Sequence, residues 1–166
     1  MIPKGGVDML AQENRGMGAA IATGIYGKGY TWSRGARDVS QIEALTVGWD
    51  ADRVLLSVYD ARDKFTAKDW VAQTVDQFGR LDGSVNNAAR YSDFTIESGD
   101  LDDLDDGLAV NIKGPHLLLR YGMQQLRKTG QGRVVNVASM SGKRVVGKHV
   151  ADALSRIQSS EPSRRT

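Results

Sequence analysis

Hydrophobic residues along the chain follow two alternating spacings. Short apolar runs, such as residues 7–11 and 53–59, have the length and composition of strands. The segments between them carry apolar residues every three or four positions, as Met17, Ile21 and Ile25 do, which is the spacing of a helix with one buried face. Strands that alternate with helices build a parallel sheet covered on both faces. The pattern therefore predicts a doubly wound α/β domain.

Five runs of the chain are predicted to be strands of one parallel sheet. The run at 53–59, Arg-Val-Leu-Leu-Ser-Val-Tyr, is apolar enough to be a strand buried on both faces. A doubly wound fold of this kind has six or more strands, so residues 1–158 are expected to form one domain that is incomplete at its C-terminal end. Residues 159–166 are expected to be a polar tail. The five strands are residues 7–11, 30–33, 53–59, 81–86 and 133–138.

Helices are predicted between these strands. One is expected at 40–46, and another begins with Thr66 as its cap and ends at Gly79. The longest helical pattern runs from 104 to 126, after an acidic stretch that suits the N-terminal end of a helix. Pro115 lies inside this helix and cannot donate to the carbonyl near Asn111. A kink is therefore expected there.

Composition narrows the class of protein. The chain has 166 residues, of which 40% are apolar and none is cysteine, so it can bury a core without disulfides or thiolate-bound zinc. It lacks an N-terminal apolar segment and any apolar stretch of the ~18 residues that span a bilayer. We expect a cytoplasmic protein without membrane contact.

Charge is unevenly placed along the chain. Residues 1–110 carry 11 basic and 18 acidic side chains, whereas residues 111–166 carry 11 basic and 2 acidic ones, which gives the net charge of +2. The basic residues of the second part are scattered and are not interleaved with aromatic residues, so no nucleic-acid partner is expected. The two histidines, His116 and His149, have no spaced partners for a metal, and no metal site is expected.

The turn after the first strand reads Ala-Gln-Glu-Asn-Arg-Gly-Met-Gly over residues 11–18. Glycines in a strand-to-helix turn let the backbone approach a pyrophosphate, and the helix N-terminus supplies N–H donors to it. A turn of this kind is weak evidence alone, because many turns simply require small residues. The candidate residues for this contact are Asn14, Arg15, Gly16, Met17 and Gly18.

Further polar or small residues follow the later strands. Because the carboxyl ends of parallel strands meet at one edge of a sheet, these residues are expected to lie near the glycine turn. They are Asp60 after the third strand, Asn87, Ala88 and Ala89 in the run Asn-Asn-Ala-Ala after the fourth, Asn111 in the long helix, and Ser139 after the fifth strand.

In order and spacing, these motifs resemble those of the short-chain dehydrogenase/reductase family, whose members have a single Rossmann domain. The family patterns are TGxxxGxG after the first strand, NNAG after the fourth, an asparagine in the next helix and a serine after the fifth strand. The resemblance runs from Asn14 to Ile157. It implies hydride transfer between a nicotinamide cofactor and a small-molecule alcohol or carbonyl, and pairing of subunits through the long helix.

The resemblance also implies catalytic roles. Ser139 would steady the substrate oxygen, and Asn111 would support a water relay. The family's catalytic Tyr-x-x-x-Lys falls on Asp152 and Arg156. An aspartate is ionised at neutral pH, more so beside an arginine, and its side chain is much shorter than that of tyrosine, so it is a poor proton donor. Alternatively, Asp152 and Arg156 are an ordinary ion pair on an exposed helix.

Two further positions depart from the family pattern. Gln12 stands where the family has the first glycine of the nucleotide turn, so a side chain is placed where backbone approaches phosphate. Ala89 replaces the glycine of NNAG, which is a mild change at negative φ and a strained one at positive φ.

Charge near the second strand bears on the choice of cofactor. A carboxylate at the end of this strand favours NAD, whereas a nearby arginine accommodates the 2′-phosphate of NADP. The chain offers Arg34 and Arg37 there, together with Arg15 in the glycine turn. NADP(H) is therefore the expected cofactor. Asp38 is the competing signal for NAD(H), although its place before Val39 and Ser40 also suits the start of a helix.

The sequence thus predicts an NADP(H)-dependent oxidoreductase of an alcohol or carbonyl, with weakened or lost catalysis. The alternative is a nucleotide-binding or oligomerising protein of the same fold without turnover. About 60 to 90 residues of a complete domain are expected to be missing, on the basis of roughly 30 residues for each β-α-β unit. An early end would leave the fifth strand as an apolar edge, and a homo-oligomer is expected.

Overall fold

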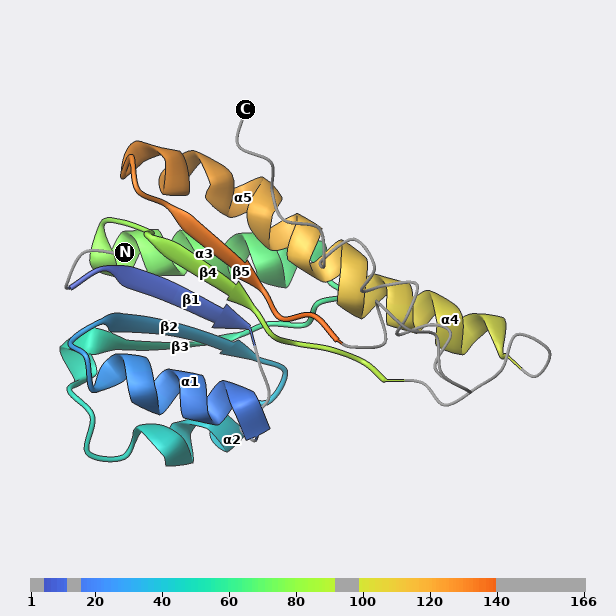
Figure 1. Cartoon of the computed structure of the whole chain (residues 1–166), viewed down its shortest axis with the longest axis horizontal. Helices are drawn as coiled ribbons and strands as arrows, with labels where there is room; N and C mark the ends of the chain where they lie inside the picture. The colour runs from blue at the N-terminus through green and yellow to red at the C-terminus, as the bar shows by residue number, and fades with distance from the viewer. Residues whose placement is uncertain (1–4, 12–15, 92–98, 140–166) are drawn as a thin grey trace.

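A computed structural model describes residues 5–11, 16–91 and 99–139 (Figure 1). Its centre is a five-stranded parallel sheet with the strand order β3-β2-β1-β4-β5. Strand β1 lies in the middle, and the chain leaves it first toward β2 and β3 and later toward β4 and β5. The strands are β1 (Val7–Ala11), β2 (Thr31–Ala36), β3 (Val54–Val58), β4 (Gly83–Asn86) and β5 (Arg133–Asn136).

Helices cover both faces of the sheet. Figure 1 shows α1 and α2 on one face and α3 and α5 on the other, so the predicted doubly wound α/β fold is confirmed. None of the described helices is long and apolar enough to cross a bilayer. The helices are α1 (Gly16–Tyr26), α2 (Ser40–Glu43), α3 (Lys64–Phe78), α4 (Leu101–Leu108) and α5 (Gly114–Lys128), with 3₁₀ turns η1 (Ala44–Thr46) and η2 (Ala51–Arg53) and a π-helical turn η3 (Ala109–Lys113).

The larger part of the core lies between the sheet and helices α3 and α5. Its centre is Trp70, which is fully buried and donates from Nε1 to the Ser33 hydroxyl at 2.7 Å. The indole packs over Gly35 in β2, where a Cβ atom would come within 2.7 Å of the ring. Glycine at this position thus lets α3 lie close to the sheet.

Two strands differ from their predicted character. Strand β2 continues to Ala36, three residues beyond its predicted end, because its backbone pairs with both β1 and β3 over that length. Strand β3 is half-buried rather than buried on both faces, and 56% of Val58 is exposed. The reason is its place at the edge of the described sheet. An apolar run predicts a strand, but it does not show whether that strand lies in the middle or at the edge of the sheet.

Helix starts show where short polar side chains decide the boundary. Helix α3 begins three residues earlier than predicted, because the Asp63 carboxylate accepts a hydrogen bond from the Phe65 N–H and caps the helix. Thr66, the predicted cap, instead donates to the carbonyls of Asp60 and Asp63 and accepts from the Asp60 N–H. Thr66 therefore closes the turn after β3. The predicted end of this helix at Gly79 is confirmed, with φ of 72°.

A kink is expected before Pro115, and the structure has a π-helical turn at this place. Helices α4 and α5 are joined by the π-helical turn η3, and the Gly114 N–H donates to the Ala109 carbonyl five residues earlier. Proline has no N–H with which to continue the normal pattern, so the backbone widens by one residue per turn there. Asn111 lies within this widened turn.

A buried carboxyl group near the amino ends of the strands makes the stability of the fold depend on pH. Asp8 in β1 is 3% exposed, and burial, together with the nearby Asp82 carboxylate, raises its pKa from 3.8 to about 6. The Asp82 carboxylate itself accepts from the Val7 N–H and pairs with Arg80. The folded protein therefore holds the Asp8 proton more tightly than the unfolded chain does.

The free energy of unfolding should consequently fall as pH rises from about 4 to about 6, by at most about 3 kcal/mol from this residue. Asp8→Asn is expected to remove this fall and to be more stable than the wild type at pH 7. Urea unfolding of both proteins between pH 4 and pH 8 measures the difference. Parallel stability curves across this range would show that the Asp8 carboxyl does not carry the effect.

Candidate functional site

Two pockets open at the carboxyl ends of the strands. The first has a volume of about 220 Å³ and lies beyond β2, β3 and β4. The second has a volume of about 500 Å³ and lies beyond β4 and β5, beside the turn η3. Ala88 lines both, so the two pockets adjoin at this small side chain. They flank the point where the chain order reverses around β1, which is the usual ligand crevice of an open α/β sheet.

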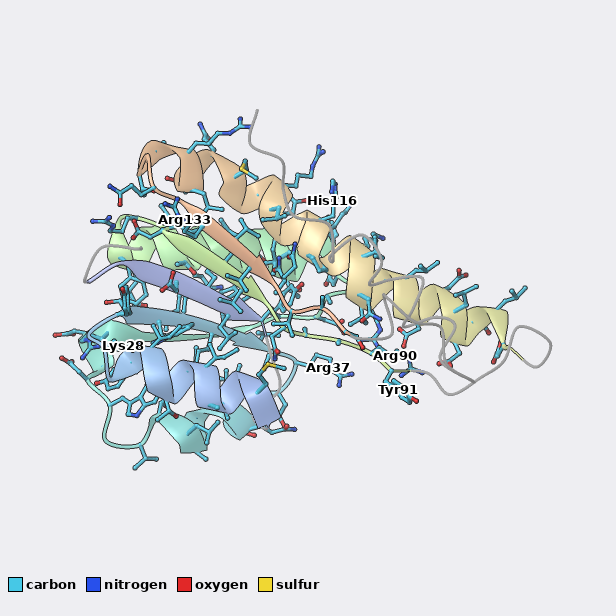
Figure 2. The ribbon with its side chains drawn as sticks, in the orientation of Figure 1. Lys28, Arg37, Arg90, Tyr91, His116 and Arg133 are labelled. Atoms are coloured by element: carbon cyan, nitrogen blue, oxygen red, sulfur yellow. The ribbon has the colours of Figure 1, made fainter. Side chains whose placement is uncertain are left out.

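The first pocket is rich in charged side chains, each positioned by the end of a strand. Arg37 follows β2, Asp60 and Arg62 follow β3, and Arg90 follows β4. Figure 2 shows Arg37 and Arg90 at the end of the sheet to which the strands point, with Tyr91 beside Arg90 and Lys28 at the opposite end. Guanidinium groups in such a place favour an anionic ligand.

Helix α4 contributes two carboxylates that pair with arginines of this pocket. Asp106 Oδ1 accepts a hydrogen bond from Arg62 Nε, and Asp106 Oδ2 accepts one from Arg62 Nη2 at 2.9 Å. Asp106 Oδ2 also lies 2.7 Å from Arg90 Nε, and Asp103 Oδ1 accepts from Arg90 Nη2. Arg62 Nη1 further donates to Asp60 at 3.1 Å. The arginines after β3 and β4 are thus tied to α4 through shared ion pairs.

The same contacts set the protonation of the network. The hydrogen bonds and charge of Arg62, with smaller contributions from the charges of Arg90 and Arg37, hold the pKa of Asp106 below its usual value. Hydrogen bonding to Asp106 and Asp60 raises the pKa of Arg62. Asp106 and Arg62 therefore form a charged pair at neutral pH.

The second pocket is lined mainly by amide and apolar groups. Asn86 at the end of β4 donates from Nδ2 to Asn136 Oδ1 at the end of β5, at 2.7 Å. Asn111, Lys113 and His116 approach from the turn η3 and the start of α5. Such a lining suits a mostly neutral ligand group held by a few hydrogen bonds.

Asn111 connects the two pockets through the backbone of Arg90. Its Oδ1 accepts from the Arg90 N–H at 2.8 Å, and its Nδ2 donates to the Arg90 carbonyl at 2.9 Å. This pair of bonds fixes the segment after β4, to which Ala88 and Ala89 belong. The side chain of Asn111 therefore has a positioning role.

Several predicted cofactor residues lie at the crevice. Asp60, Ala88 and Ala89 line the first pocket, and Asn87 precedes them at the end of β4. No non-glycine residue in the described part of the chain has positive φ, so Ala89 fits the turn without strain.

The described part of the glycine turn is the start of α1. Gly16 has φ of +63°, a conformation that strains any residue with a Cβ. Gly18 is buried in the first turn of the helix, whereas 59% of Met17 is exposed. Four residues of this turn, Gln12, Glu13, Asn14 and Arg15, lie outside the described residues.

The predicted place of Arg34 in a turn is wrong. Because β2 extends to Ala36, Arg34 lies inside the strand, in register with Leu10 and Leu56, and is fully buried. Burial lowers its pKa to about 10. Arg34 lines neither of the two pockets, and Arg37 is the arginine that follows the strand.

Asp38 serves a helix start rather than a ligand. Its Oδ1 accepts from both the backbone and the hydroxyl of Ser40, and its Oδ2 accepts from Gln41 Nε2 at 2.9 Å. These hydrogen bonds hold the pKa of Asp38 below its usual value. Of the two interpretations that the sequence left open, the contacts favour the helix start.

The catalytic candidates are described only in part. Ser139 follows β5 and is half-buried. Asp152 and Arg156 lie outside the described residues, as does His149. Within the ranges that the structure describes, no group of three or more acidic or histidine side chains could hold a metal ion.

Four residues were missed by sequence reasoning: Arg62 and Arg90, which line the first pocket, and Asp103 and Asp106, which pair with them from α4. The two aspartates were interpreted only as the solvated start of a helix. Their spacing of three residues, which places them on one face of a helix, was the available signal, but their arginine partners are distant in sequence.

Comparisons with known proteins agree on one family. The family model described as short chain dehydrogenase matches residues 12–151. The chain is 34% identical over 145 residues to the agropine synthesis reductase of Rhizobium rhizogenes, covering 87% of this chain and 34% of that protein. It is 31% identical to the D-threitol dehydrogenase of Mycolicibacterium smegmatis, covering 89% of this chain and 57% of the relative. This chain thus spans about one third of the first relative's length and just over half of the second's.

Solved structures give the same result. The crystal structure of a short-chain dehydrogenase from Streptomyces avermitilis superposes with a TM-score of 0.86 at 27% identity, covering 92% of this chain and 56% of that one. A short-chain dehydrogenase/reductase from Serratia marcescens gives a TM-score of 0.85 at 28% identity, covering 95% and 65%.

Proposed function

Because the chain belongs to the short-chain dehydrogenase family, we propose that its crevice binds a nicotinamide dinucleotide and serves an oxidoreductase that acts on a small alcohol or carbonyl compound. The observation that carries this proposal is the pair of pockets that adjoin at Ala88, one lined by arginines and the other by amides. A dinucleotide is elongated, and in NADP(H) its adenosine end carries a 2′-phosphate that the nicotinamide end lacks. Its two ends match the two pockets.

The residues present fit the adenosine half. Arg37 offers a guanidinium fork to a ribose phosphate, and the Asp60 carboxylate can accept from a hydroxyl or amine of the adenosine. Gly16 at the start of α1 has a positive φ, which strains any residue that carries a side chain. A glycine there leaves the N–H groups of the helix accessible to a pyrophosphate.

The second pocket fits the reacting half. When bound, the nicotinamide donates or accepts a hydride. Ser139 would donate a hydrogen bond to the substrate oxygen, and Asn111 would hold the Arg90 segment that separates the pockets. Relatives named as reductases and as a dehydrogenase support an oxidation–reduction reaction.

We expect NADP(H) to bind more tightly than NAD(H). Arg37 lines the first pocket, and the nearby Asp38 carboxylate is engaged by Ser40 and Gln41. Arg37→Ala should weaken NADP⁺ binding by about 10- to 100-fold, the usual value of hydrogen bonds to a charged group, and leave NAD⁺ binding nearly unchanged. Calorimetric titration of both nucleotides measures this difference.

Lys28→Ala is a suitable control, because it removes one positive charge at the opposite end of the sheet (Figure 2). It should leave the affinity for both nucleotides unchanged. Equal loss of NADP⁺ affinity in the two variants would show that only the net charge matters. It would overturn the assignment of Arg37 to the 2′-phosphate.

A binding protein without turnover is the second candidate function. The observation that favours it is the presence of Asp152 and Arg156 at the positions of the family's catalytic tyrosine and lysine. Both candidates share the nucleotide site and differ in whether NADPH is consumed when a carbonyl compound is added.

We also expect the protein to form a homo-oligomer. All four residues of β5 are exposed, including 39% of Val134 and 52% of Val135, and β4 is its only neighbour in the described sheet. An apolar strand edge favours pairing with another chain. Sedimentation at micromolar concentration should show a species heavier than the 18.0 kDa monomer. A single monomeric species would contradict this expectation.

A further inference from the structure

The charges around the first pocket balance one another. Three guanidinium groups and one carboxylate line it, and two further carboxylates on helix α4 pair with two of these arginines. The six residues are Arg37, Arg62 and Arg90, and Asp60, Asp103 and Asp106. A phosphate that enters this pocket therefore meets Arg62 and Arg90 with their charges already paired within the protein.

Asp106 is the centre of this balance. It occupies the guanidinium fork of Arg62 with both oxygens and also faces Arg90 Nε. The charge of Arg37 acts on it as well. Two oxygens on one planar group are what a guanidinium fork also recognises in a phosphate. The Asp106 carboxylate thus occupies the position on Arg62 that two phosphate oxygens could occupy.

We propose that Asp106 is a specificity-determining residue, an internal anion that competes with the 2′-phosphate of NADP(H) for the arginines of the first pocket. The inference rests on the proposed binding of a nicotinamide dinucleotide. As a consequence of this competition, the ratio of NADP⁺ to NAD⁺ affinity in the wild type should be smaller than it would be without the Asp106 carboxylate. NAD⁺ lacks the 2′-phosphate, so its affinity is independent of this competition.

Exposure of the groups makes an exchange of partners feasible. The side chains of Asp106, Arg62 and Arg90 are 25%, 33% and 40% exposed, so water reaches each ion pair. Ion pairs in such places are weak, and a dianionic phosphate can replace a carboxylate in them. Arg62 also keeps Asp60 as a second partner when Asp106 is displaced.

The chain offers a closely matched control. Asp105 lies on the same helix, one residue before Asp106, is exposed and points to no arginine of the network. Asp106→Asn and Asp105→Asn therefore change the net charge and the helix charge equally. Only the first removes the competing anion while keeping the shape of the side chain.

Calorimetric titration of wild type and both variants with NADP⁺ and NAD⁺ tests the proposal. Asp106→Asn should raise NADP⁺ affinity by about fivefold relative to Asp105→Asn, the upper value for pairs this exposed, with NAD⁺ affinity unchanged. Equal ratios of NADP⁺ to NAD⁺ affinity in the two variants would overturn it. If the wild type binds neither nucleotide, the proposed function itself fails. That result differs from equal affinity ratios, which overturn only the role of Asp106.

Arg62→Gln provides a second test, should Asp106→Asn fail to fold, as a thermal melt would show. It removes a cation for which phosphate and Asp106 compete. NADP⁺ affinity should fall by about threefold or more with NAD⁺ affinity unchanged. An unchanged NADP⁺ affinity in Arg62→Gln would overturn the proposal independently.

Discussion

Replacing Trp70 with alanine is expected to lower the free energy of unfolding by about 3–5 kcal/mol, a large fraction of the stability of a typical domain. The side chain is fully buried, packs over Gly35 and lies 5.0 Å from the Tyr59 ring centroid. Its removal leaves a cavity between α3 and the sheet that rigid neighbours cannot fill. Urea unfolding at fixed pH measures the loss.

Trp70→Phe separates the volume of the ring from its hydrogen bond. Phenylalanine keeps most of the packing but cannot donate to Ser33, whose hydroxyl still has Thr74 Oγ1 at 2.6 Å. We expect less than half of the loss seen for alanine, because no buried hydroxyl is left without a partner. Equal losses in the two variants would show that the hydrogen bond, and not the packing, dominates.

Turnover of NADPH with simple ketones and aldehydes is expected to be about 10²- to 10⁴-fold slower than ordinary enzyme rates of ~10 per second. The expected reason is chemical: by the resemblance to the family, its proton donor and its lysine fall on Asp152 and Arg156. An ionised carboxylate has no proton to give to a developing alkoxide.

The rate is measured from the absorbance of NADPH, with a short-chain dehydrogenase that has the intact Tyr-x-x-x-Lys motif assayed in parallel. Binding of NADPH without consumption is the expected result for this chain. Rates equal to those of the parallel enzyme on the same compounds would contradict the argument about Asp152.

The order of elements could be predicted from the sequence because it depends on local spacing. The alternation of apolar periods predicts the five strands, and Pro115 predicts a kink near Asn111, where the structure has a π-helical turn. Element ends were less certain. Strand β2 extends past its predicted end because β1 and β3 pair with it along its length, and this pairing cannot be read from residues 31–36 themselves.

The candidate site could be predicted only where a residue directly follows a strand. Asp60, Ala88 and Arg37 belong to this group and do line the first pocket. The ion pairs of Asp106 with Arg62 and Arg90 join three separate turns or helices, so their formation depends on tertiary packing. Charge alone suggested a solvated helix start, which is the commonest use of such aspartates.

One crevice is expected to hold both ends of a nicotinamide dinucleotide, and a crystal structure of this chain grown with NADP⁺ tests this expectation. We expect the adenosine phosphate beside Arg37 in the first pocket and the nicotinamide in the second pocket near Asn111, with Ala88 between them. Nucleotide bound elsewhere on the protein, or the reverse orientation in the crevice, would contradict it.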